Sequence, residues 1–452
     1  MSSDNNMNTN TNPTLESTGG NAKEQFSSFF GFLMVCIGFV VGVGSLWRFP
    51  YVCGSNGGAL FLATYIIIII LICIPLLTAE MSIGFSTKKT PAAAYKQLAP
   101  GKKWYFAGYM HAATSLILNA YTITVYGTVL NYMFRTATGY FTGMEGKELS
   151  DYYNSFAGSF SQQALWCLLS LAIVALILRG GLQGGVEKLS KYMLPVLAVI
   201  MVVLIVLGLR LPGAGDGLAF LLKPDFSSFG MDAVQAALGQ AFFAVGIGML
   251  SSMVFGSYIG NPKQNLVPSS TIICGGIVVA GLMAGSMIFP MVFAYGLQPS
   301  EGSGLTFITL TSVFAQIPGG RIIGVLFYFG FFIAALTTMV GSLEGIIGFI
   351  RGIVDISRGK AMAITLILLI LLAIPSALSQ SVFHIFDFLV SNILLVVGAF
   401  VIAIFVGYVW GIDNFLEAIN VKNKYVKVWL TVSVKFISPI AIAIIFITQM
   451  IG

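Results

Sequence analysis

Long apolar runs dominate the chain, and short polar segments separate them. Each run holds roughly 20 or more mostly apolar residues, which is the length that a helix needs to cross a bilayer. The pattern predicts eleven transmembrane helices, near residues 26–53, 57–84, 105–136, 162–180, 187–211, 230–258, 265–297, 321–353, 358–380, 382–411 and 425–450. We therefore expect an all-α polytopic membrane protein.

Positive charge is unevenly distributed among the polar segments. Segments 85–104, 180–190, 351–360 and 412–427 are rich in lysine and arginine, whereas segment 137–161 shows no such excess. Loops rich in these residues stay in the cytoplasm. All four basic segments fall on one side if the N-terminus is cytoplasmic, so we predict a cell-membrane protein with a cytoplasmic N-terminus and an extracellular C-terminus.

The first 25 residues are polar and rich in asparagine and threonine. They lack the apolar core of a signal peptide. Such a composition cannot bury enough apolar surface to fold. Residues 1–25 are therefore predicted to form a disordered cytoplasmic tail.

Two of the apolar runs are interrupted by paired glycines, "GVG" at 42–44 and "GIG" at 246–248. The two runs are five spans apart, so they cross in opposite directions. Glycine-interrupted segments at matching places in two halves point to the central site of a transporter. The sequence thus predicts two inverted five-helix repeats, 26–211 and 230–411, followed by one additional transmembrane helix at 425–450.

An interrupted helix offers backbone groups to a ligand that an intact helix does not. The N–H groups at one half carry partial positive charge, and the carbonyls at the other carry partial negative charge. In the first run, the amides of Val43 and Gly44 would face an anion. The carbonyls available to a cation would be those of Gly38, Val40 and Val41. Gly38 and Gly42 also form a GxxxG pair, so close helix packing remains an alternative role for these glycines.

A few polar side chains in the spans could assist such a site. Arg48 and Asp387 fall at similar depth near the outer ends of spans 1 and 10, where they could pair as an outer gate, although Arg48 could also extend to the lipid headgroups. Thr337 and Thr338 could supply hydroxyl oxygens to a hard cation, or bond the carbonyls four residues earlier. Tyr121 in span 3 is by default a packed aromatic residue.

Composition narrows the function further. The chain is 57% hydrophobic and 9% charged, against about 25% charged residues in soluble domains. Its net charge of +6 is spread over loops, and no nucleic-acid-binding module is present. The five cysteines lie in apolar runs and there are only two histidines, so neither disulfides nor zinc chemistry is expected. No HExxH or GxSxG motif occurs, and Glu80 and Glu344 are interpreted as structural acids, so we do not expect an enzyme.

Five segments in order resemble the neurotransmitter:sodium symporter family, in its bacterial amino-acid transporter branch. The most specific is "GVGSLWRFPYVCGSNGGALFLATYI" at 42–66, which resembles the family's span 1–2 signature. The other four are "GQAFFAVGIGM" (239–249), "GGVEKLSKYMLP" (184–195), "IAALTT" (333–338) and "FDFLVSN" (386–392). The resemblance implies an inverted five-plus-five repeat with broken helices 1 and 6, and a sodium-coupled importer that works by alternating access.

The resemblance also implies a substrate site. The substrate carboxylate would meet the Val43 and Gly44 amides and the Tyr121 hydroxyl. Amine carriers of the family have an aspartate at the position of Gly42. Its absence favours a substrate that brings its own carboxylate. The implied residues are Val40, Gly42, Val43, Gly44, Ile117, Tyr121, Phe243, Ala244, Gly246, Met249, Thr338 and Ser342. None is acidic, so a neutral, hydrophobic or aromatic amino acid is expected.

By the same resemblance, one sodium site is complete and a second is not. The family's second site would use the carbonyls of Gly38, Val41 and Ala334 with the hydroxyls of Thr337 and Thr338. The first site would use Val40, Ser45 and Ala244. It departs from the family, because Ser45, Ala244 and Ile277 stand where asparagine, threonine or serine, and asparagine are usual. Chloride dependence is not expected, because Gly281 replaces the chloride-site serine or its acidic substitute, although Tyr65 and Gln240 match.

The cytoplasmic gate departs as well. Lys23 and Phe26 stand where the family has arginine and tryptophan, and Gly352 stands where it has aspartate. Asp355 is a candidate substitute for that aspartate. The inner gate is therefore expected to close differently.

Three functions remain open at this point. The first is sodium-coupled import of a neutral amino acid. The second is a carrier of the same fold without obligatory sodium, either proton-coupled or an exchanger, and the third is an amino-acid sensor that does not transport. The expected partners are a small-molecule amino acid and membrane lipid, with no nucleic acid, and a homodimer is compatible with the sequence.

Overall fold

The computed structural model describes residues 24–226, 230–299 and 304–451. Helices form all the regular structure in these ranges, which confirms the all-α prediction. Their bounds follow the apolar runs closely: the run expected at 105–136 is α6 (Tyr105–Ala137), and the run expected at 321–353 is α15 (Gly320–Ile353). Short π-helical turns, labelled η, interrupt several of the long helices.

The remaining elements fall into two groups along the chain. The first group is α1 (Phe29–Val40), η1 (Gly44–Arg48), α2 (Phe49–Ser55), α3 (Ala59–Ile68), η2 (Ile69–Cys73), α4 (Ile74–Thr87), α5 (Pro91–Leu98), α7 (Gly146–Gly158), α8 (Phe160–Arg179), η3 (Leu182–Glu187), α9 (Lys188–Leu209) and α10 (Ala214–Leu222). The second group is α11 (Met231–Val245), α12 (Ser251–Ser257), α13 (Leu266–Ala294), η5 (Leu305–Thr309), α14 (Leu310–Gln316), α16 (Arg358–Leu378), α17 (Gln380–Phe388), η6 (Leu389–Leu394), α18 (Leu395–Ile404), η7 (Phe405–Val409), α19 (Ile412–Ala418), α20 (Lys424–Val432), η8 (Ser433–Ile437) and α21 (Ser438–Ile451).

Within the described residues, nine helices are long and apolar enough to span a membrane. A tenth span is the pair Phe29–Val40 and Gly44–Ser55, which bends by 43° at its break. Helices α11 and α12 would provide another span only if they cross the bilayer together as one broken helix. The predicted count of eleven therefore depends on that pair.

The long helices separate into inner and outer ones. In its most apolar stretch, α6 is 83% buried inside the protein, whereas α8 and α9 are each 28% buried. The outer helices expose large apolar side chains such as Leu176, Val199 and Leu371. A belt of this kind suits contact with lipid.

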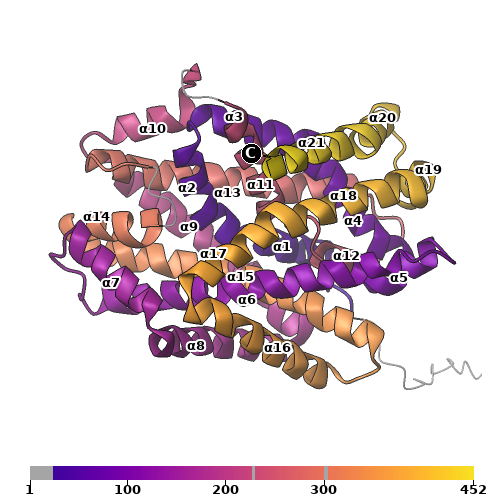
Figure 1. Cartoon of the computed structure of the whole chain (residues 1–452), viewed down its shortest axis with the longest axis horizontal. Helices are drawn as coiled ribbons and strands as arrows, with labels where there is room; N and C mark the ends of the chain where they lie inside the picture. Colours follow the sequence, from indigo (N-terminus) through magenta and orange to yellow (C-terminus); the bar gives the residue numbers. More distant parts are fainter. Residues whose placement is uncertain (1–23, 227–229, 300–303, 452) are drawn as a thin grey trace, which may run out of the picture.

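Short helices cover the two ends of the bundle (Figure 1). Helices α7, α10 and α14 lie toward the left end in this view, and α5 and α19 lie toward the right end. The long helices run between these two layers. Within the bundle, α15 packs against α6 and α1, and α1 also contacts α13 and α9. Helices from both predicted repeats thus surround one centre, where both broken helices lie.

Candidate functional site

The first break lies between α1 and η1. The helix ends at Val40, and the peptide of Val41 still bonds back to Ile37. The Gly42 carbonyl then accepts hydrogen bonds from the N–H groups of Ser45 and Leu46, at 3.1 and 3.0 Å, which starts the second half of the helix. The interruption therefore covers residues 41–43, one residue earlier than the predicted 42–44.

The second break lies between α11 and α12. Two glycines there adopt the left-handed backbone region, Gly246 with φ of 70° and Gly248 with φ of 86°. This conformation is costly for residues with a side chain. The chain turns through residues 246–250 before α12 begins at Ser251.

Oxygen atoms gather beside the first break. The Thr338 hydroxyl contacts the Gly38 carbonyl oxygen at 3.4 Å, which joins α1 to α15. The Thr337 hydroxyl donates to the Ala334 carbonyl at 3.0 Å. A side chain at Gly42 would meet both Thr338 and the Ala334 carbonyl. The structure therefore brings together four of the five residues expected at the second sodium site. The fifth, Val41, is buried at the end of α1. Such a donor set suits a hard cation, which prefers oxygen ligands.

Two of the three residues expected at the first sodium site, Val40 and Ala244, line one cavity, and the third, Ser45, follows Gly44 in the chain. The backbone of Gly44 lies against Ala244, because a Cβ on Gly44 would come within 3.0 Å of the Ala244 Cα. The Ser45 hydroxyl is buried and has no hydrogen-bond partner in the described part of the chain. Val40 lines the neighbouring cavity. Of the three positions that depart from the family pattern, Ser45 alone brings a side-chain oxygen here.

Gly281 and Gln240, which align with the family's chloride site, contact other protein groups in this structure. A Cβ on Gly281 would touch the ring of Phe49 at 3.4 Å. The Gln240 amide donates to the Gly44 carbonyl at 2.7 Å and accepts from Arg48 at 3.2 Å. Gln240 thus connects α11 to the second half of the first broken helix.

A small cavity of about 30 Å³ lies between the two breaks. Its lining is mostly apolar and contains eight of the twelve expected substrate residues: Val40, Val43, Gly44, Phe243, Ala244, Gly246, Met249 and Thr338. The other four lie outside the lining: Gly42, Ile117, Tyr121 and Ser342. Four residues that the sequence analysis did not name complete it: Phe39, Leu118, Thr122 and Tyr126.

The outer gate residues lie beyond the cavity. Asp387 is near enough to Arg48 to act on it electrostatically, but the two make no ion pair within 4 Å in the described residues. Instead, the guanidinium of Arg48 lies over the Phe243 ring, 4.8 Å from its centroid. The Tyr121 hydroxyl donates to Asp387 at 3.0 Å. Tyr121 thus contacts the gate.

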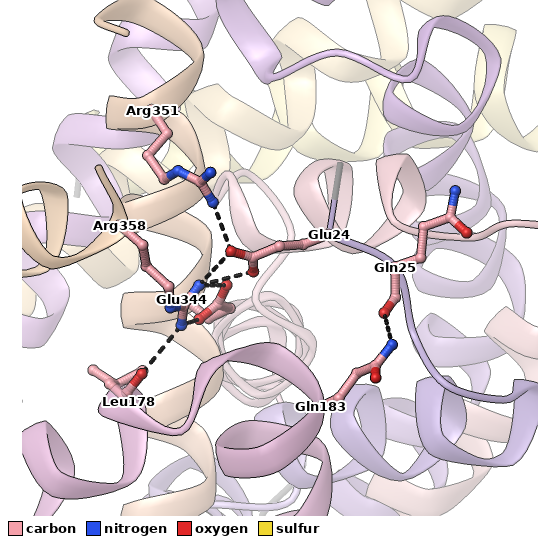
Figure 2. Close-up of polar contacts among 7 residues, drawn as sticks. All are labelled: Glu24, Gln25, Leu178, Gln183, Glu344, Arg351 and Arg358. Atoms are coloured by element: carbon pink, nitrogen blue, oxygen red, sulfur yellow. Dashed lines mark hydrogen bonds and ion pairs between the residues drawn. The ribbon is translucent and has the colours of Figure 1, made fainter. Parts of the chain in front are cut away.

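On the opposite side, Glu24 joins a charge network that the sequence analysis did not foresee. Figure 2 shows its carboxylate between two arginines, with Arg351 at 2.6 Å and Arg358 at 2.8 Å. Arg358 also pairs with Glu344 and donates to the Leu178 carbonyl at 3.3 Å. Glu344, expected to be a structural acid, is fully buried and ion-paired with Arg358.

Neighbouring contacts explain the departures at this gate. A Cβ on Gly352 would overlap the side chain of Thr90, so the space for an aspartate there is already filled. Asp355 lines the adjacent cavity of about 440 Å³ but makes no ion pair within the described ranges. Phe26 packs edge-on against Tyr258, with centroids 6.1 Å apart. Lys23 lies outside the described residues.

Comparison with known proteins decides the family. The sodium:neurotransmitter symporter family matches residues 23–145 and 148–452. The chain belongs to this family. A sodium-dependent transporter of Bacillus subtilis, YhdH, is 32% identical over 440 residues, which cover 94% of this chain and 97% of the relative. A sodium-dependent transporter of Haemophilus influenzae is 31% identical, over 96% of this chain and 99% of the relative.

A solved symporter shares the fold. The crystal structure of MhsT in complex with L-phenylalanine superposes with a TM-score of 0.87 at 33% identity, covering 94% of this chain and 99% of MhsT. The human sodium- and chloride-dependent creatine transporter 1 is 25% identical, over 95% of this chain and 77% of its own length. The resemblance inferred from the motifs is therefore confirmed. The protein is a membrane transporter of a sodium-dependent family and not an enzyme.

Proposed function

We propose that this symporter imports a neutral, hydrophobic or aromatic amino acid and couples that import to sodium. The observation that carries the proposal is the meeting of two interrupted helices around one apolar cavity, with a cluster of oxygen atoms beside it. The backbone at the breaks would bind the charged groups of the amino acid, and the apolar walls would contact its side chain.

The cavity lining supports the choice of substrate. No charged residue is among the residues that line it, so a cationic or anionic side chain would lack a partner. The phenylalanine bound in the MhsT structure is an amino acid of this type. A cavity of about 30 Å³ holds about two water molecules, so Met249 and Phe243 must move to admit an amino acid. Methionine adapts readily to such changes.

Sodium would occupy the oxygen cluster of Gly38, Val41, Ala334, Thr337 and Thr338. Each charge that enters at −100 mV contributes about 2.3 kcal/mol, and a tenfold sodium gradient adds about 1.4 kcal/mol. One sodium could therefore concentrate a zwitterion roughly 500-fold. A second sodium would bind at Val40, Ser45 and Ala244, with Ser45 as the side-chain ligand.

Alternating access would open the two sides in turn. Arg48, Phe243 and Asp387 would close the outer side, and the Glu24 network would close the cytoplasmic side. In this proposal the N-terminus is cytoplasmic and the C-terminus extracellular, and residues 26–211 and 230–411 are the inverted repeats.

One observation favours the alternative of a carrier without obligatory sodium. Alanine at 244 and isoleucine at 277 leave the first sodium site with few side-chain oxygens. If coupling does not need sodium, uptake will persist when choline replaces it. A sensor that binds without transport would show ligand binding but no flux.

The test uses the full chain in proteoliposomes. Sodium-dependent accumulation of labelled phenylalanine or leucine, lost in choline, is the expected result. Undiminished accumulation in choline would reject sodium coupling. Thr338→Val should raise the sodium concentration for half-maximal uptake about tenfold, because it removes a hydroxyl ligand without changing side-chain size. The matched control is Thr365→Val in α16, whose buried hydroxyl donates within its own helix to the Ala361 carbonyl at 2.9 Å.

A further inference from the structure

One face of α6 carries polar side chains toward the second break. His111, Ser115 and Asn119 are spaced four residues apart and are all fully buried. Residues with this spacing lie on the same side of a helix. In an apolar core, polar groups are retained where they satisfy other buried polar groups.

Two of these side chains bond the backbone that the break leaves open. The Nδ1 atom of His111 lies 2.7 Å from the carbonyl oxygen of Gly248. The Ser115 hydroxyl oxygen accepts a hydrogen bond from the Leu250 N–H at 3.2 Å. Gly248 is held by its carbonyl and Leu250 by its amide, so α6 fixes the middle and the end of the turn. Asn119 extends the same face to α15 by donating to the Ser342 hydroxyl at 2.6 Å.

The histidine also reaches a second helix. Its Nε2 atom lies 3.0 Å from the Tyr95 hydroxyl. A carbonyl oxygen can only accept, so Nδ1 carries the proton in this contact, and Nε2 then accepts from Tyr95. Tyr95 belongs to α5 at the end of the bundle and packs edge-on against Phe405, with centroids 4.5 Å apart. The imidazole therefore connects α5 to the broken helix.

We propose that His111 is a positioning residue of the substrate site. It holds the Gly248 carbonyl so that segment 246–250 keeps the shape that places Gly246 and Met249 in the cavity wall. Through Tyr95 it also couples this segment to α5. This inference rests on the proposed function, because the segment it positions is the one that would contact the amino acid.

A matched pair of variants separates the two contacts of the ring. In His111→Asn, the amide nitrogen stands near the former Nδ1 and keeps the bond to Gly248. In His111→Gln, the amide reaches toward the former Nε2 and loses that bond. Both variants keep a polar side chain in the core. Tyr95→Phe removes only the link to α5.

The experiment measures KM and maximal uptake rate, each normalised to folded transporter, in proteoliposomes. His111→Gln should raise KM for the amino acid about tenfold, since it leaves a buried carbonyl without a partner. His111→Asn should stay within about threefold of wild type. Tyr95→Phe should leave KM nearly unchanged and alter the maximal rate.

A control variant tests whether the loss of any buried hydrogen bond would raise KM. Gln163 in α8 is buried and donates to the Ala157 carbonyl at 2.7 Å, outside the residues that line the cavity. Gln163→Leu should lower thermal stability without raising KM. Equal KM values for His111→Asn and His111→Gln, or a similar rise in Gln163→Leu, would overturn the positioning role. Failure of the wild type to bind or accumulate any amino acid would instead reject the proposed function.

Discussion

The two broken helices use glycine for partly different physical reasons. In the first break, neither Gly42 nor Gly44 has a positive φ, but a side chain on either would run into α15 or α11. In the second break, Gly246 and Gly248 both have a positive φ. Both breaks thus need glycine for close approach, and the second break also needs it for chain direction. Two sequences as alike as "GVG" and "GIG" therefore meet different constraints.

The two breaks also differ in the groups that lie beside them. The first break lies beside the hydroxyl of Thr338 and the carbonyl of Ala334, which are groups suited to a cation. The second break is held by the His111 and Ser115 side chains of α6. Substitutions at the first break should therefore change sodium dependence, and substitutions at the second should change folding and substrate binding.

The largest effect is expected for Gly248→Ala. The φ of 86° strains any residue with a Cβ, at a cost of about 1–2 kcal/mol. The added Cβ would also come within 2.7 Å of the Leu395 carbonyl oxygen, where backbone must move. We expect a clear drop in melting temperature and loss of uptake.

Gly239→Ala in α11 is the control for this substitution. A Cβ there meets no atom within 4 Å, and alanine favours a helix over glycine by about 1 kcal/mol. Its melting temperature should stay the same or rise. A Gly248→Ala protein as stable and active as Gly239→Ala would contradict the requirement for a left-handed residue.

A smaller and more selective effect is expected for Gly42→Ala. No backbone strain arises, but the new methyl group would displace the Thr338 hydroxyl from its contact with Gly38. The sodium concentration for half-maximal uptake should rise about tenfold, with little change in the stability of the sodium-free protein.

A double-mutant cycle tests the cause of this effect. If Gly42→Ala acts only by moving the Thr338 hydroxyl, it should add little to Thr338→Ala. Fully additive losses would mean that the alanine acts elsewhere.

Most of the fold could be predicted because membrane helices are determined by composition. A run of apolar residues needs no knowledge of its partners to be recognised, so the predicted runs match the observed helices within a few residues. The short connecting helices α7, α10 and α14 were missed. These helices are too short to be recognised as membrane spans from the apolar pattern, and α7 is also too polar.

The parts of the site that are formed by backbone groups could be predicted from the sequence. The glycine motifs located both breaks, and the oxygen cluster followed from the family motif. Tyr126, Thr122 and Leu118 were missed because the depth of a residue along a 33-residue helix such as α6 is set by tertiary packing. Glu24 was missed because it was assigned to the polar tail, and its partners lie more than 320 residues away in the chain.

A still smaller effect is expected for Ser45→Ala, which tests whether the first break serves a second cation. The Ser45 hydroxyl is buried without a partner in the described residues, so it is available to an ion. We expect about a threefold loss of apparent sodium affinity. Ser170→Ala in α8 removes a hydroxyl of the same kind away from the breaks and should leave sodium dependence unchanged. Equal sodium curves for Ser45→Ala and wild type would remove Ser45 from the sodium site.

The smallest effect concerns the charges that precede the first broken helix. Glu24 keeps its pair with Arg358 when Arg351 is lost, so the Arg351 pair should contribute only about 0.2–1 kcal/mol. Arg351→Gln should speed amide hydrogen exchange in residues 25–33 by about two- to fivefold, and Glu24→Gln should speed it more, because it also loses the pair with Arg358. The double variant should add little to Glu24→Gln, because Arg351 acts on this segment through Glu24. Glu145→Gln, at the N-cap of α7 and at the other end of the bundle, is the control and should leave this exchange unchanged. Unchanged exchange in both single variants would mean that packing alone, with Phe26 against Tyr258, holds the start of α1.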